Sequence, residues 1–379
     1  MQITKLFTSF FESEKAGGLV LVICTAVSLI LANSSWSESY LHLWHTQIGS
    51  QPAEYWINDG LMAIFFLLIG LELEREVYIG ELSKLKDAAL PLAGALGGML
   101  VPALLFTLFN HNTPTHKGYG IPMATDIAFA IGILSLLGKR VPPALKVFLT
   151  ALAVIDDLGA IIMIALFYTD NINLLNLGIA LGIFGLLLIL NRLKVDNLLW
   201  YLIGGIFMWY FMLHSGVHAT ITGVLLAFAI PFQNGGRHTI SYQLQHWLHH
   251  PVAFLIIPIF ALCNTAVVIE GDFAKTLSQP YSLGILFGLV LGKPLGIFLM
   301  SWLTVKLNIS QLPEGFTWKR LIGLGMLGGI GFTMSIFITL LAFADIEIIN
   351  NSKFVIVIAS TLSGILGYFW LQQSLPKAQ

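Results

Sequence analysis

The sequence predicts an all-α polytopic membrane protein with twelve transmembrane helices, forming one integral membrane domain over residues 1–379. Three observations support this fold class. Hydrophobic residues make up 56% of the chain and charged residues only 10%, against roughly 25% charged residues in soluble domains. The mean hydropathy is +0.83. Finally, apolar windows of about 20 residues, long enough to cross a ~30 Å hydrocarbon core, recur along the whole chain.

Each of these windows is predicted to form one span. The first follows Glu12 and Glu14 and is long for a cleaved signal, so it is predicted to be a retained helix rather than a leader. Turn signals such as His214-Ser215-Gly216 separate several of the others. The predicted spans lie near 16–33, 59–80, 88–109, 119–138, 143–168, 173–190, 197–213, 216–231, 248–269, 281–306, 320–343 and 353–373.

Lysine and arginine are divided unevenly between the two faces that these spans define. An even number of spans places both termini on one side. If that side is the cytoplasm, the opposite face carries only Lys117, Lys275 and Lys353, and the loop 34–58 has neither Lys nor Arg. The positive-inside rule therefore predicts cytoplasmic termini. The net charge of -1 gives no basic surplus that would indicate nucleic-acid binding. Membrane lipid is the expected surrounding of the apolar spans.

Four charged residues lie deep inside the predicted spans: Asp126, Asp156, Asp157 and Lys293. A charge at the centre of a membrane helix costs about 2.5–3.5 kcal/mol on insertion scales, so each must face protein or water. The adjacent acids Asp156 and Asp157 point about 100° apart on a helix. One can therefore face a cavity while the other reaches a neighbouring helix. Buried ion pairs with a purely structural role are the alternative, although three acids outnumber the one lysine.

Two of the spans carry residues that interrupt helices. Gly120, Pro122 and Gly132 surround Asp126, and residues 323–336 read GLGMLGGIGFTMSI. Each half-helix end carries about half a unit of charge, so Asp126 suits positive helix ends and Lys293 suits negative ones. Unwound carbonyl groups would be available to coordinate a cation. Close packing of glycine-rich helices is the alternative explanation.

Seven segments closely resemble the NhaA-type sodium/proton antiporters of bacterial inner membranes. They occur in consistent order, and the likeness covers nearly the whole chain, from about residue 16 to 373. The segments are ALAVIDDLGAII, PMATDIAFAIG, LKVFLTALAVIDD, HSGVHATITGV, GKPLGI, LPEG and GGIGFTMSIFI. The resemblance implies the NhaA fold, with an inverted-topology repeat of three plus three helices and two discontinuous crossing helices. It also implies electrogenic, pH-regulated export of Na⁺, and of Li⁺, in exchange for inward H⁺. A transporter of this kind is not an enzyme and needs no cofactor.

The resemblance also assigns roles to individual residues. It makes Asp156 and Asp157 the central acids that hold Na⁺ and H⁺, with Asp157 foremost. Thr125 and Asp126 lie at the first helix break, and Lys293 is expected to pair with Asp156. The second discontinuous helix would contain Gly329, Gly331 and Thr333, and a pH-responsive region would contain Glu72, Glu76, His246 and His249.

Two positions depart from the pattern of the family. Gln245 stands where a glutamate is expected, and Glu74 stands where a lysine is expected. Both differences change the charge of the pH-responsive region. We therefore expect transport to be retained with a shifted or broadened pH profile.

The chemistry of the central acids suits exchange. Sodium is a hard cation that prefers oxygen ligands, which the carboxylates, the Thr125 hydroxyl and unwound carbonyls supply. Burial raises the pKa of a carboxyl group by as much as about 3–5 units, so the same acid could hold a proton at working pH. If only the loaded states change access, competition between the two ions produces antiport.

Weaker signals lie elsewhere in the chain. His246, His249 and His250 have spacings that would suit a metal, but no cysteine or acid accompanies them, so an interfacial or pH-responsive role is favoured. Asp59 and the charges at 72–76 could form a cytoplasmic funnel that attracts cations. His218 is predicted to be a packing residue, as are Cys24 and Cys263.

Three other functions deserve comparison with antiport. An intramembrane aspartyl protease needs two acids that face each other from two helices, whereas Asp156 and Asp157 are adjacent. A prenyl-transfer enzyme needs spaced acids, and LGAI follows Asp157. A cation channel is the nearer rival. The glycine-rich helices could also provide the contact surface of a homodimer.

Overall fold

The computed structural model describes residues 14–376 apart from 170–171 and 269–272. Within these ranges, eight helices are long and apolar enough to cross a membrane, or up to ten if each of two bent pairs is counted as one span. The prediction of a helical membrane protein is therefore confirmed, whereas the count of twelve spans stays a prediction. Glu12 and residue 269 of the window 248–269 lie outside the described residues.

The chain forms two compact units, which are described separately. The first comprises Met1–Tyr40, Lys84–Ala160 and Asn264–Gln379, and the second comprises Leu41–Ser83 and Ile161–Cys263. Helix α8 (Pro143–Phe167) passes from the first unit into the second.

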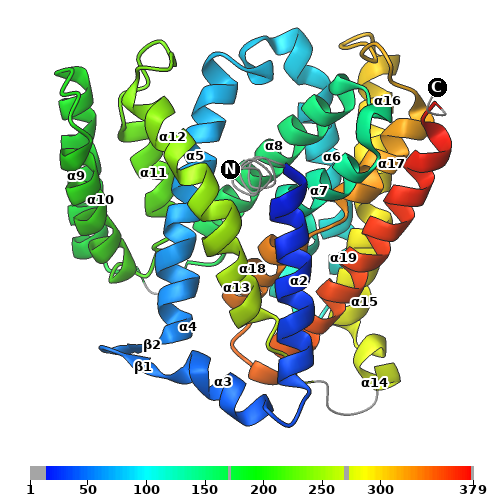
Figure 1. Cartoon of the computed structure of the whole chain (residues 1–379), viewed down its shortest axis with the longest axis horizontal. Helices are drawn as coiled ribbons and strands as arrows, with labels where there is room; N and C mark the ends of the chain where they lie inside the picture. Colours follow the sequence, from blue (N-terminus) through cyan, green and yellow to red (C-terminus); the bar gives the residue numbers. More distant parts are fainter. Residues whose placement is uncertain (1–13, 170–171, 269–272, 377–379) are drawn as a thin grey trace, which may run out of the picture. The chain divides into compact units, whose positions relative to one another are not determined.

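The first unit contains the two interrupted helical segments and the helices that pack around them (Figure 1). Its elements are α2 (Glu14–Ala32), the start of α3 (Ser37–His45), α6 (Leu85–Phe109), η3 (His116–Met123), α7 (Ile127–Leu136), η4 (Gly138–Arg140), most of α8, α14 (Phe273–Ser278), α15 (Pro280–Phe287), η6 (Gly288–Gly292), α16 (Lys293–Lys306), α17 (Trp318–Gly328), α18 (Phe332–Ala342) and α19 (Ile346–Ser374).

The second unit contains a short hairpin and a set of helices around α5. The hairpin pairs β1 (Gln47–Ile48) with β2 (Gln51–Pro52) in antiparallel register. The helices are α4 (Ala53–Tyr55), η1 (Trp56–Leu61), α5 (Met62–Tyr78), η2 (Glu81–Ser83), α9 (Leu174–Arg192), α10 (Leu198–Leu213), α11 (Ile221–Ala229), α12 (Ile240–Pro251), η5 (Val252–Ile256) and α13 (Ile257–Asn264). Figure 1 shows α9 and α10 side by side.

Polar caps determine where several apolar runs become helices. Asn173 accepts from two backbone N–H groups at the start of α9, and Asp345 does the same at the start of α19. Thr317 caps α17 through the Arg320 N–H. Such side chains satisfy N–H groups that the helix itself leaves unpaired. The cap at Asp345 also explains why the last helix begins seven residues before the predicted window at 353.

All twelve predicted windows contain helix, but some elements differ from the prediction. The window 216–231 holds only the short α11, and the window near 248 begins earlier, at Ile240, where Thr239 caps α12. The loop 34–58 contains α3 and the hairpin, and α14 falls between two predicted spans. These elements are too short or too polar to be seen as apolar windows.

Close backbone contacts hold the first unit together. A Cβ atom on Gly97 would collide with the Gly296 carbonyl, and one on Gly296 with the Gly97 carbonyl, so α6 and α16 touch directly. Gly18 and Gly132 similarly bring α2 against α7. Small residues allow such approach between membrane helices.

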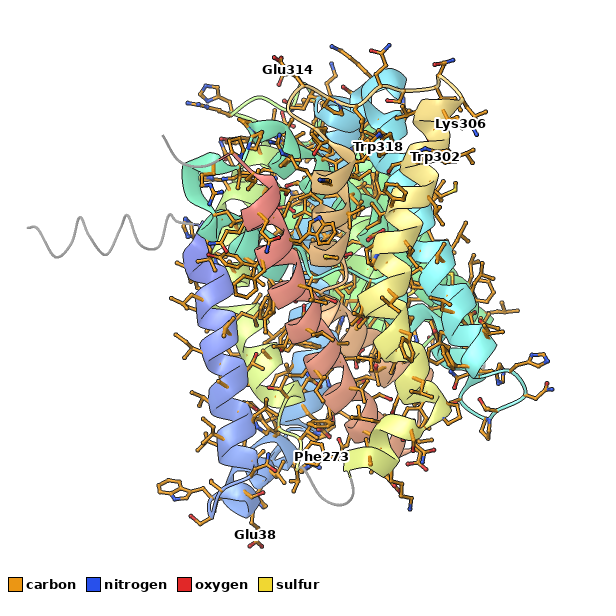
Figure 2. The ribbon with its side chains drawn as sticks, turned by 90° about the vertical axis from the view of Figure 1, so that its right-hand side faces the viewer. Glu38, Phe273, Trp302, Lys306, Glu314 and Trp318 are labelled. Carbon is orange, nitrogen blue, oxygen red and sulfur yellow. The ribbon has the colours of Figure 1, made fainter. Side chains whose placement is uncertain are left out.

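The two ends of the first unit carry polar and aromatic side chains (Figure 2). At one end, the Lys306 ammonium lies 4.6 Å from the centre of the Trp302 ring. Glu314 and Trp318 lie at the same end, and Glu38 and Phe273 lie at the other. Tryptophan and lysine are enriched where membrane helices meet water.

Candidate cation and proton site

Two helix breaks meet inside the first unit. The segment η3 ends at Met123, the backbone is extended at Ala124 and Asp126, and α7 then begins. The second break separates α17 from α18, which are bent by 48°. The Asp126 N–H donates to the Ile330 carbonyl at 2.6 Å, which joins the two breaks through their main chains.

Asp126 caps a helix on each side of this junction. Its Oδ1 accepts from the Phe129 N–H at 3.0 Å, at the start of α7. Its Oδ2 accepts from the Thr333 N–H at 3.1 Å and from the Thr333 hydroxyl at 2.5 Å, at the start of α18. One buried carboxylate therefore faces two helix N-termini, where partial positive charge collects.

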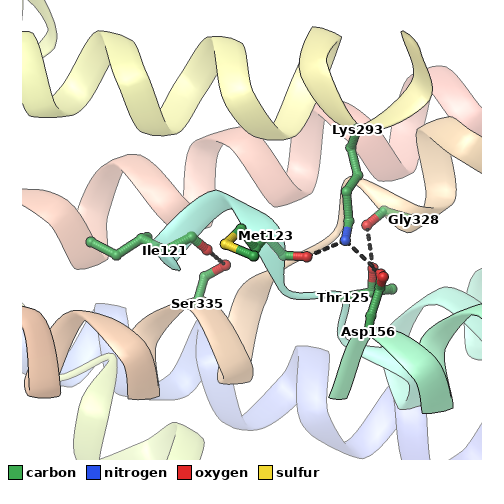
Figure 3. Close-up of polar contacts among 7 residues, drawn as sticks. All are labelled: Ile121, Met123, Thr125, Asp156, Lys293, Gly328 and Ser335. Atoms are coloured by element: carbon green, nitrogen blue, oxygen red, sulfur yellow. Dashed lines mark hydrogen bonds and ion pairs between the residues drawn. The ribbon is translucent and has the colours of Figure 1, made fainter. Parts of the chain in front are cut away.

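Lys293 meets the opposite kind of helix end. Its side chain is fully buried, with 0% exposure. The ammonium donates to the carbonyl of Met123, the last residue of η3, and to Asp156 Oδ2 at 2.5 Å (Figure 3). Lys293 therefore connects the C-terminal end of a half-helix to the acid on α8.

Asp156 lies beside the second break as well. Thr125 Oγ1 is 2.7 Å from Asp156 Oδ2 and 2.8 Å from the Gly328 carbonyl (Figure 3). A threonine hydroxyl has one proton to donate, so it serves only one of these two acceptors at a time. Asp156 Oδ1 is buried and has no hydrogen-bond partner among the described residues. Asp156 Oδ1 can therefore still accept a hydrogen bond.

Asp157 is the next residue of α8 and is buried to the same degree, with 1% exposure. The structure therefore brings Asp156, Thr125 and Lys293 together at the junction of the two breaks, with Asp157 buried next to Asp156 on α8.

The glycines of the second break allow close approach rather than an unusual backbone. Gly329 and Gly331 both have φ values in the right-handed region. A Cβ atom on Gly329 would collide with the Leu289 carbonyl and lie 2.9 Å from Ser363 Oγ. Larger residues would therefore separate the break from η6 and α19.

A second set of candidate residues lies in the second unit. Glu72 Oε1 and His249 Nδ1 are 3.8 Å apart. Arg75 lies over the Tyr242 ring at 4.8 Å, and His246 stacks on the same ring with centroids 6.1 Å apart. Glu72, Arg75, His246 and His249 thus form a surface cluster around the Tyr242 ring at the contact of α5 with α12.

The remaining predicted residues of this unit lie in different surroundings. Glu76 is half-buried near the end of α5. Asp59 is half-buried in the π-helical turn η1, where its carbonyl accepts from Trp209 Nε1 at 3.3 Å. His218 Nε2 contacts the Tyr168 carbonyl at 2.8 Å. Within the described ranges, no three His, Cys, Asp or Glu residues are placed to hold a metal.

Sequence reasoning did not find several groups that shape the junction. The carbonyls of Met123, Gly328 and Ile330 leave no signal in a sequence. Ser360 of α19 accepts from the Phe332 N–H at 3.1 Å, and nothing in its surrounding sequence marks it. Ser335, which donates to the Ile121 carbonyl at 2.7 Å (Figure 3), lies inside GGIGFTMSIFI and could have been identified from that segment.

The fold and this buried group define a multi-pass helical membrane protein with an acidic centre. The family model for Na⁺/H⁺ antiporter 1 matches residues 8–371. The chain belongs to this family of integral membrane antiporters, known as NhaA.

Individual relatives agree with this assignment. The Na⁺/H⁺ antiporter NhaA of Flavobacterium psychrophilum is 66% identical over 98% of this chain and 97% of its own length. That of Vibrio vulnificus is 49% identical over 97% and 96% respectively. The solved sodium proton antiporter MjNhaP1 of Methanocaldococcus jannaschii has a TM-score of 0.54 and 18% identity, covering 98% of this chain and 100% of that one. This last comparison shows similarity of fold alone.

Proposed function

We propose that this chain exports Na⁺, and also Li⁺, from the cytoplasm in exchange for H⁺, and that both ions bind at Asp156 and Asp157. The observation that carries the proposal is the incomplete hydrogen bonding of Asp156. Its Oδ2 faces Lys293 and Thr125, whereas its Oδ1 has no partner among the described residues.

Sodium binding is supported by the oxygen atoms at the junction. Carboxylate, hydroxyl and carbonyl oxygens are the ligands that hard cations prefer. Asp156, Asp157, Thr125 and the Gly328 carbonyl supply them within one buried region. A cation on Asp156 would compete with the Lys293 ammonium, so sodium binding would weaken that ion pair.

Proton binding is supported by the position of the Thr125 hydroxyl. A protonated Asp156 can donate to Thr125 Oγ1, whose own proton then reaches the Gly328 carbonyl. In that state, Thr125 Oγ1 and the Gly328 carbonyl would each accept a hydrogen bond. Because the same carboxylate is used in both states, Na⁺ and H⁺ exclude each other, and alternating access of the loaded states gives exchange.

Exchange is electrogenic if two protonatable groups discharge for each sodium ion bound. Asp157 with Asp156, or Asp157 with Lys293, could form that pair. Such a cycle moves net charge and responds to the membrane potential.

The finer features of the fold belong to the same proposal. The breaks at 124–126 and 329–331 are the expected parts of two inverted repeats, and their main chains touch. We infer a single transport domain with twelve spans and two discontinuous crossing helices, in the bacterial inner membrane with both termini in the cytoplasm. A homodimer surrounded by lipid is the expected assembly.

We further propose that the cluster of Glu72, Arg75, His246 and His249 contributes to pH regulation together with Glu76. The Glu72–His249 contact at 3.8 Å supports this, because a histidine next to a carboxylate changes its charge near neutral pH. Glu72 and Glu76 near the end of α5, and Asp59 before its start, would also attract cations.

The experiment that tests exchange uses sealed proteoliposomes with an imposed pH gradient. We expect sodium, but not potassium, to collapse the gradient, and Asp157→Asn to abolish the response. Asp196→Asn, which changes an exposed aspartate in the second unit, is the matched control and should behave as the original chain. A response that persists in Asp157→Asn would reject this acid as the carrier. Sodium flux that requires no opposing proton movement would indicate a channel.

A further inference from the structure

Glu74 is a buried acid that the proposed mechanism does not use. The residue is 4% exposed and therefore buried, whereas the side chain of Glu72, two residues earlier, is 23% exposed. Glu74 Oε2 is buried and has no hydrogen-bond partner among the described residues. Glu74 is therefore not part of an open acidic funnel at this end of α5.

The face of α5 that carries Glu74 packs against apolar groups. Residues four apart share one face of a helix, so Glu74 lies between Gly70 and Tyr78. A Cβ atom on Gly70 would touch Ala227 and the Val224 backbone, and Tyr78 stacks on Phe232 at 5.1 Å. This places Glu74 beside the last turn of α11, whose sequence ITGVLLAFA contains no titratable side chain.

The basic side chains near Glu74 contact other residues. Arg75 lies over Tyr242, and His249 contacts Glu72. The described residues form no ion pair with Glu74. The titratable residues of the elements packed against α5 are Asp59 in η1, Glu81 in η2, and Tyr242, His246, His249 and His250 in α12, whereas η5 has none.

We propose that Glu74 is a proton-binding site, distinct from the junction of the two breaks, that holds a neutral carboxylic acid at neutral pH. An ionised carboxylate buried without a cation is strongly disfavoured. Sodium is a poor ligand for this position because it requires several oxygen atoms, and the facing surface of α11 is apolar. A proton needs only the carboxylate itself.

The position of Glu74 gives this proton a structural consequence. Loss of the proton would place a negative charge between α5 and the last turn of α11. We expect the contact of these two helices to weaken as the pH rises. The inference does not depend on the ions transported elsewhere in the chain.

Infrared spectroscopy of the full-length protein in lipid tests the proposal directly. Protonated carboxylic acids have a C=O stretching band that carboxylates lack. At neutral pH, we expect Glu74→Gln to remove part of this band and Glu314→Gln, which changes an exposed glutamate, to leave it unchanged. The buried aspartates are present in all three proteins and contribute equally. An unchanged band in a folded Glu74→Gln protein would overturn the proposal.

A second variant keeps the test decisive if Glu74→Gln does not fold. Glu74→Met should retain the thermal unfolding midpoint at neutral pH, because an apolar chain replaces a neutral group in apolar surroundings. At alkaline pH, the midpoint of the original chain should fall by at least twice as much as that of Glu74→Met. A large loss of stability in Glu74→Met at neutral pH would show that Glu74 is ionised and paired, and would reject the inference.

Discussion

Asp126 and Asp156 lie at the same junction and are both buried, yet their hydrogen bonding differs. Both oxygens of Asp126 accept bonds, from Phe129 and from Thr333. Asp156 uses one oxygen for Lys293 and Thr125, while its other oxygen has no partner among the described residues. A fully satisfied carboxylate holds structure in place, whereas a partly satisfied one can still take an ion. Variants of the two residues should separate these roles.

The largest effect is expected from Asp126→Ala. This change leaves the N–H groups of Phe129 and Thr333 and the Thr333 hydroxyl without their acceptor. Each unsatisfied group costs about 1–3 kcal/mol, so for three groups we expect a loss of about 3–9 kcal/mol and a sharply lower thermal unfolding midpoint. Asp126→Asn keeps a side-chain acceptor and should lose less. Equal stability of the alanine variant and the original chain would contradict the capping role.

A smaller loss of stability is expected from Lys293→Met. Removing one partner of a buried ion pair costs about 3–5 kcal/mol, because it leaves the other charge uncompensated. The double variant Lys293→Met with Asp156→Asn should recover part of that loss. Thermal unfolding of both single variants and the double variant measures the coupling. Additive effects would show that the 2.5 Å contact contributes no coupling energy.

Thr125→Val should affect sodium binding more than folding. The change removes the hydroxyl that lies between Asp156 and the Gly328 carbonyl and keeps the shape of the side chain. Loss of about 1.4 kcal/mol corresponds to a tenfold change in affinity, and we expect the KM for sodium to rise by about that factor. Thr125→Ser retains the hydroxyl and is the control. A KM unchanged by valine would remove Thr125 from the set of ligands.

The comparison also shows what a sequence can predict about such a site. Scarce charges inside apolar windows identified Asp126, Asp156, Asp157 and Lys293, because burying a charge requires a reason. The resemblance added the pairing of Lys293 with Asp156. The sequence could not show that Asp126 serves two helices at once, because this depends on where the second break lies in space.

The two units also differ in how much of their structure could be predicted from the sequence. In the first unit, glycines and a proline marked the breaks. In the second, the position of Glu74 within the sequence GLELERE predicted only a charged helix end. The structure instead buries this one acid, because its face of α5 is the face that packs on α11. Helix periodicity over so short a polar run is too weak to distinguish the buried acid from its half-buried neighbours.

The smallest effect is expected at the surface cluster of α5 and α12, from Gln245→Glu. Gln245 lies one turn before His249, and residues four apart share a helix face. An added carboxylate favours the protonated form of nearby histidines, so the pH profile of exchange should move toward alkaline pH while maximal activity is retained. Proteoliposome exchange measured from mildly acidic to alkaline pH compares the two profiles.

Gln311→Glu, at an exposed position between α16 and α17, controls for added charge. Superimposable profiles for Gln245→Glu and the original chain would show that position 245 does not set the pH response. A shift produced equally by Gln311→Glu would attribute the effect to net charge, because exposed charges act weakly and over long range.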